Sequence, residues 1–203
     1  MKYFITESQV GRLLTEEVEG LGSFLYTMGE SFPIVDQYYG VLKSEIEKSK
    51  CQKIEWCNFS VETALGASFS DGVLINRRVL EKSLGACLFT IFHEIAHQYQ
   101  YKKYGADFAI KCYQEDIDIK EAVKIIKKTE NVADEYGIRK CRELVKIGLI
   151  TNKEGIKIGP YRWYSDKEYE TYIIQMREKI KQSGLTSTDE ISSMLYNWIK
   201  SLV

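Results

Sequence analysis

Two histidines and a glutamate form the pattern in this sequence whose residue types and spacing predict a definite chemistry. They lie in His93-Glu94-Ile95-Ala96-His97, and the 203-residue chain contains only these two histidines. In a helix, residues four apart lie about 40° apart around the axis, so His93 and His97 can offer imidazole nitrogens to one metal ion. Glu94 lies on the same side of the helix but does not point directly at the ion. This position suits a carboxylate that takes a proton from water in metal-assisted hydrolysis. The segment therefore predicts a catalytic metal site with Zn²⁺ as the ion.

A catalytic zinc ion generally has three protein ligands and one open position, so a third ligand must come from elsewhere. We expect this ligand to be Glu130, because the chain has no third histidine and a second acidic motif begins at this residue. Asp134 would share its helical face and would accept the free N–H of a ligating histidine, which fixes the tautomer of that ring. Glu135 remains the alternative ligand if the helix is rotated differently. The other alternative is an exposed acidic helix face with solvated carboxylates.

These two motifs, His-Glu-x-x-His and then, after a spacer of 32 residues, Glu130-x-x-Ala133-Asp134, resemble those of the gluzincin metallopeptidases. The pattern is similar to that of the soluble ImmA/IrrE-type bacterial and phage peptidases. Membrane prenyl-protein endopeptidases share the second motif, but their membrane helices have no counterpart in this sequence. The resemblance covers about Gly66 to Cys141. It implies a minimal zincin fold, a peptide or protein substrate, and a strand before the metal helix, residues 64–70 or 73–76, that binds the substrate in extended form.

Enzymes of this kind often steady the oxyanion of the reaction with a further histidine or a tyrosine. With no third histidine in the chain, tyrosine or arginine must serve. Our candidates for this catalytic role are Tyr161, Arg162 and Tyr164, in the run Tyr161-Arg162-Trp163-Tyr164 that follows a Gly-Pro pair. The alternative is that these side chains only pack the loop or stack on the core.

Hydrophobic periodicity predicts the elements that position these residues. A helix over about residues 80–103 would carry His93 and His97, and a helix over about 118–147 would carry Glu130. Short segments rich in β-forming residues, at 53–59 and at 67–76 around a Ser-Asp-Gly turn, predict a small sheet. The expected fold class is α+β, with a small β-sheet packed on the metal-site helix.

Further helices are expected on both sides of this core. Before it, helices are predicted over about residues 7–28 and 31–50. After it, capping boxes at Ser165 and Ser187 each predict the start of a C-terminal helix. We expect a single metallopeptidase-like domain over residues 1–203. It comprises a helical N-terminal region at 1–50, the zincin core at 53–148, and a loop with helices at 149–203.

Composition restricts the partners and the compartment. The net charge is −1 and the lysines are spread along the chain, so neither nucleic acid nor a membrane surface is an expected partner. The five cysteines form no C-x-x-C pair, which favours reduced thiols. The N-terminal residues do not resemble a secretory signal. We therefore expect a cytoplasmic protein.

Two functions follow from the motifs. The first is a zinc-dependent endopeptidase that hydrolyses peptide bonds, with Glu94 as the general base. The alternative is a non-catalytic, zinc-containing protein-interaction module on the same scaffold, which would not need the carboxylate of Glu94. A purely structural zinc site is less favoured, because such sites usually have four protein ligands and prefer cysteine.

Overall fold

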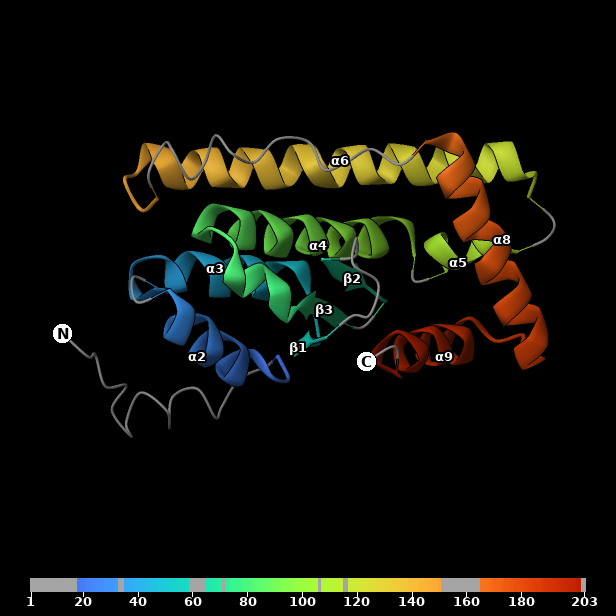
Figure 1. Cartoon of the computed structure of the whole chain (residues 1–203), viewed down its shortest axis with the longest axis horizontal. Helices are drawn as coiled ribbons and strands as arrows, with labels where there is room; N and C mark the ends of the chain where they lie inside the picture. The colour runs from blue at the N-terminus through green and yellow to red at the C-terminus, as the bar shows by residue number, and fades with distance from the viewer. Residues whose placement is uncertain are drawn as a thin grey trace.

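The chain folds into a three-stranded sheet with helices before and after it (Figure 1). The computed structural model describes residues 18–32, 35–58, 65–70, 72–105, 107–114, 117–150 and 165–201. Up to the metal-site helix, the elements are α2 (Leu21–Ser31), α3 (Val35–Ser49), β1 (Lys53–Cys57), β2 (Gly66–Ser68), β3 (Gly72–Asn76), the 3₁₀ helix η1 (Arg77–Glu81) and α4 (Leu84–Tyr104). They are followed by α5 (Phe108–Tyr113), α6 (Ile119–Lys146), α8 (Asp166–Ser183) and α9 (Thr188–Ser201). The predicted α+β class is confirmed.

The sheet is mixed, with the strand order β1-β3-β2. The central strand β3 pairs in parallel with β1 and antiparallel with β2, so the predicted hairpin is confirmed. All five residues of β3 are buried. Val73 and Ile75 belong to the core cluster shared with α2, α3 and α4, whereas Leu74 belongs to a second cluster with residues of α9. Both faces of the sheet are thus covered, as expected for a strand whose consecutive residues Val73, Leu74 and Ile75 are all apolar.

The two outer edges of the sheet differ. Along β1, Glu19 forms a parallel bridge with Lys53, and the Ile54 amide donates to the Glu19 carbonyl oxygen at 3.0 Å. No strand among the described residues pairs with the outer side of β2. Of the two segments that the sequence offers as a substrate-binding strand, residues 73–76 are therefore wrong, because β3 is paired on both sides. Of these two segments, β2 is the one whose outer edge has no paired strand among the described residues.

Helix α4 lies against the sheet on one side and against α6 on the other (Figure 1). Ser83 caps its start, with a hydroxyl that accepts from the Ala86 amide at 3.2 Å, and Gly105 caps its end. The two long helices run antiparallel and approach closely at Gly137, where a Cβ would lie 2.9 Å from Phe89 Cε2. A side chain at this position would force Phe89 or one of the helices to move, so glycine allows the two helices to pack closely here.

The C-terminal helices close the other side of the sheet. The capping box at Ser165 is present, since its hydroxyl accepts from the Glu168 amide and Glu168 accepts from the Ser165 amide. Helix α9 packs Ile191 and Leu195 into the cluster that contains Leu74. The short helix α5 was not predicted. No helix in the described ranges is long and apolar enough to cross a membrane.

Candidate metal centre

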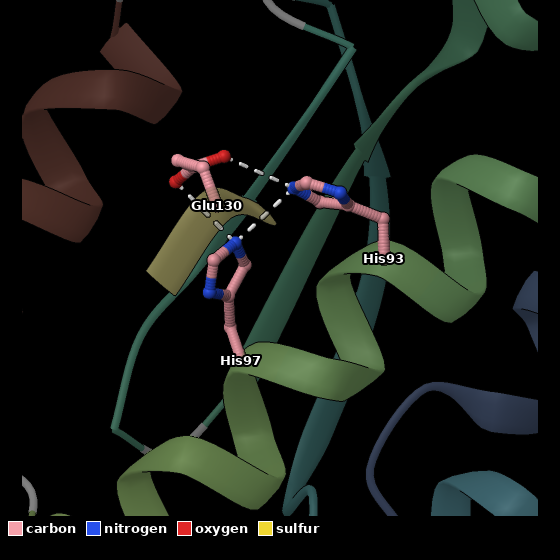
Figure 2. Close-up of side chains that lie close together, drawn as sticks. All are labelled: His93, His97 and Glu130. Carbon is pink, nitrogen blue, oxygen red and sulfur yellow. Dashed lines mark hydrogen bonds and ion pairs between the residues drawn. The ribbon is translucent and has the colours of Figure 1, made fainter. Parts of the chain in front are cut away.

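Three side chains from two helices face one another at the centre of the α4–α6 contact (Figure 2). His93 and His97 come from α4 and Glu130 from α6. The two Nε2 atoms lie 3.1 Å apart, and the Glu130 oxygens lie 3.3 Å from His93 Nε2 and 3.5 Å from His97 Nε2. All three ligand atoms lie within 4.8 Å of one another, so the group could hold a metal ion. The donor set, two imidazoles and a carboxylate, is one that catalytic zinc sites use.

The ring of His93 is oriented from behind by Asp134. Its Nδ1 lies 2.8 Å from Asp134 Oδ1, and Asp134 is itself buried one turn after Glu130 on α6. A carboxylate at this position accepts the Nδ1 proton and leaves Nε2 as the nitrogen that faces the group. The structure thus brings together four of the residues that the sequence singled out. The alternative Glu135 is exposed and lies outside this group.

The ring of His97 has a corresponding partner that sequence reasoning missed. His97 Nδ1 lies 2.9 Å from Gln100 Oε1, and the buried amide of Gln100 donates from Nε2 to the Thr129 carbonyl oxygen at 2.9 Å. Because Nε2 must be the donor to a carbonyl, the oxygen of the amide faces the ring and accepts its Nδ1 proton. The available signal was the spacing of three residues from His97, which places both side chains on one helical face.

The carboxylate of Glu94 lies beneath the backbone of the edge strand β2. Glu94 is only 6% exposed. A Cβ placed on Gly66 would be 2.5 Å from Glu94 Oε1 and 2.6 Å from its Cγ, so only glycine fits above this side chain. Within the described residues, Glu94 forms no side-chain hydrogen bond that would tie its carboxylate to a structural role. This leaves the carboxylate able to bind and move a proton.

The electrostatics of the group follow from burial and from the close charges. Burial would lower the pKa of His93, but the carboxylates of Asp134 and Glu130 raise it to about 10. Burial raises the pKa of Glu94 to about 8, against the charge of His93. Burial lowers the pKa of His97, and the two histidines together lower the pKa of Glu130, although burial would raise it. The carboxylates of Glu130 and Asp134 therefore stabilise a positive charge at His93. A metal ion would replace the proton on His93 Nε2, the nitrogen that faces the group.

The remaining predicted site residues, Tyr161, Arg162 and Tyr164, lie outside the described residues. Their proposed role in steadying the oxyanion stays a prediction.

Comparison of the chain with protein-family models, with curated proteins and with solved structures gave no match.

Proposed function

We propose that this protein is a zinc-dependent endopeptidase. One observation carries the proposal: the buried carboxylate of Glu94 lies against Gly66 of the edge strand β2, and it is close enough to His93 and Glu130 for their charges to shift its pKa. A base next to a ligand group and below a strand edge is the arrangement that hydrolysis of an extended peptide requires. The resemblance of the two motifs to those of gluzincin peptidases, with the ImmA/IrrE type most similar in pattern, supports the same conclusion.

Zinc fits the residues present. Two imidazole nitrogens and one carboxylate leave a fourth position open, and both imidazoles are oriented through their second nitrogen. When bound, zinc would supply a Lewis acid that polarises a carbonyl group and lowers the pKa of water to about 7. The positive charge would also favour the ionised form of Glu94, because an opposite charge nearby lowers the pKa of a carboxyl group.

Glu94 would act as the general base. Its carboxylate would accept the proton of the attacking water and then donate it to the leaving amine of the cleaved peptide bond. Burial makes the side chain a stronger proton acceptor than an exposed glutamate, as its raised pKa indicates. The same burial under Gly66 fixes the position of the carboxylate, which general-base catalysis needs.

The peptide would bind along the outer edge of β2, with which no strand of the described ranges pairs. The Asn76 amide donates to the Leu65 carbonyl, and the Phe69 amide donates to the Gly72 carbonyl, so residues 65, 67 and 69 form the hydrogen-bonded pairs with β3. The backbone groups of Gly66 and Ser68 therefore point to this outer edge. Gly66 can pair with an extended peptide directly above Glu94, which places a substrate carbonyl close to the base.

Two measurements test the proposal. Elemental analysis of the purified protein is expected to give about one zinc per chain, and Glu130→Ala is expected to lose most of it. A peptide library analysed by mass spectrometry is expected to be cleaved by the wild type and left intact by Glu94→Gln, which retains zinc and fold. Glu135→Gln, an exposed carboxylate on α6, is the matched control and should cleave normally. Cleavage that survives in Glu94→Gln would overturn the proposed mechanism, and a wild type that binds zinc but cleaves nothing would favour the interaction module.

A further inference from the structure

Ser68, at the end of the edge strand, is attached to α4 through both its side chain and its backbone. The Gln98 amide donates from Nε2 to Ser68 Oγ at 2.5 Å, and the Tyr101 hydroxyl donates to the Ser68 carbonyl oxygen at 3.1 Å. The same Gln98 nitrogen lies 2.7 Å from the Phe69 carbonyl oxygen. These contacts hold the end of the β2–β3 hairpin at a fixed place along the metal-site helix.

The contact of Tyr101 is on the side of β2 where a substrate would pair. Because Ser68 belongs to a pair that is not hydrogen-bonded to β3, its carbonyl oxygen points to the outer edge of β2. A donor to a carbonyl lies near the plane of that group, which is the position that the N–H of a paired strand would occupy. The Tyr101 hydroxyl therefore takes the place of the next backbone hydrogen bond beyond Gly66.

Tyr101 also shares a face of α4 with the metal-site histidines, since it lies four residues after His97 and eight after His93. Burial raises the pKa of Tyr101 well above its ordinary range, so the hydroxyl remains a protonated donor. The side chain is thus a fixed part of the wall of the site at the Ser68 end of β2.

We propose that Tyr101 determines specificity by ending the substrate-binding edge at Gly66. This inference rests on the proposed function and names the substrate class within it. In an antiparallel pairing, the substrate residues that pass from Gly66 toward Ser68 lie N-terminal to the paired residue. Substrates are therefore recognised by backbone pairing at one residue next to Glu94, and the chain N-terminal to it turns away from β2. Peptides with only a few residues before the cleaved bond are bound as well as long ones.

The test uses nested peptides that share one cleaved sequence and carry one to five extra residues at the N-terminal end. For the wild type, kcat/KM is expected to change by less than about twofold once two residues precede the cleaved bond. Tyr101→Phe frees the Ser68 carbonyl, and Tyr101→Ala also removes the ring. In both variants, kcat/KM for each longer peptide should be roughly two- to tenfold higher than in the wild type, which is the effect of one added hydrogen bond. Tyr104→Phe, an exposed tyrosine at the end of α4, is the matched control.

Binding of the same peptides to Glu94→Gln, measured by fluorescence anisotropy, provides a readout that does not need hydrolysis. In Glu94→Gln alone, affinity is expected to change by less than about twofold once two residues precede the cleaved bond. With Tyr101→Phe added to Glu94→Gln, each longer peptide is expected to bind roughly two- to tenfold more tightly. If kcat/KM or affinity of the wild type rises steeply with N-terminal peptide length, the inference is overturned, even if the Tyr101 variants do not fold. The inference would also be overturned if the wild type and the Tyr101 variants showed the same dependence on peptide length, or if only C-terminal extension improved binding in the variants. Absence of any peptide binding would overturn it as well. If every peptide binds but none is cleaved, the length dependence still decides the inference while the proposed function fails.

Discussion

The Gln100 amide joins His97 to the backbone of the opposite helix. It accepts from His97 Nδ1 at 2.9 Å and donates to the Thr129 carbonyl at 2.9 Å, directly before Glu130 in the chain. One side chain therefore orients a histidine of α4 and fixes the turn of α6 that presents the glutamate. This couples the spacing of the two helices to the geometry of the ligand group.

Replacing Gln100 tests this coupling. Gln100→Ala is expected to reduce zinc affinity by about 10- to 100-fold, because His97 loses the acceptor that fixes its tautomer. The measurement is a competition titration against a chelating dye, with circular dichroism as the check on folding. Gln175→Ala, an exposed glutamine on α8, should leave the affinity unchanged. An unchanged affinity in Gln100→Ala would show that the His97 ring is oriented without it.

The partner of the other histidine gives an independent prediction. Asp134→Asn keeps an oxygen that can accept from His93 Nδ1 but removes the negative charge behind the ring. We expect the fold to be retained and zinc affinity to fall by about 10- to 100-fold. If Asp134→Asn and the wild type have equal zinc affinity in the same dye competition, Asp134 contributes only to helix packing and not to metal binding.

The metal-site helices could be predicted because their signals are local. The spacing of His93 and His97 needs only the helical repeat, and Asp118, predicted to start the second helix, accepts from the amides of Lys120 and Glu121 at its first turn. The shared face of Glu130 and Asp134 followed from the same repeat. These features depend on residues close together in the chain, and the structure has them where the sequence placed them.

Other features could not be predicted because they depend on contacts between distant segments. Helix α5 has six residues, too few to show a periodicity. The contact of Gly66 with Glu94 and that of Tyr101 with Ser68 arise only when β2 is laid on α4. Nothing in the sequence around Gly66 or Tyr101 distinguishes them from an ordinary loop glycine or a helix tyrosine.

A buried carboxylate away from the site predicts how stability depends on pH. Burial would raise the pKa of Glu45, but hydrogen bonds from Tyr136 and Lys140 hold it below its ordinary value of 4.5. A carboxyl group whose pKa is lower in the folded state stabilises the fold above the unfolded pKa and loses this contribution as the pH falls through the folded value. The stabilisation is thus complete at neutral pH and decreases as the pH falls below 4.5 toward the lowered pKa of the folded state.

Glu45→Gln tests this dependence. At pH 7 the variant is expected to lose about 1.5 to 3 kcal/mol of unfolding free energy, measured by urea denaturation, because hydrogen bonds to a charged group are lost. The difference from wild type should shrink as the pH is lowered below 4.5. Glu47→Gln, a more exposed neighbour on α3, serves as the control at both pH values. A difference that stays constant down to about pH 3 would mean that packing, and not charge, is responsible.

The contact between Gly66 and Glu94 gives the most direct test of where the chemistry takes place. In Gly66→Ala the new Cβ would meet Glu94 Oε1 at 2.5 Å, so the carboxylate or the edge strand must move. The three proposed metal ligands lie on α4 and α6, so zinc content is expected to stay near one per chain. A base displaced by about 1 Å can cost about 100-fold in rate, and we expect a loss of kcat/KM of that order. Gly40→Ala, where a Cβ meets nothing within 4 Å, is the matched control and should retain full activity. If the Gly66→Ala protein keeps zinc and cleaves peptides at the wild-type rate, Glu94 is not the base of a reaction that takes place at the β2 edge.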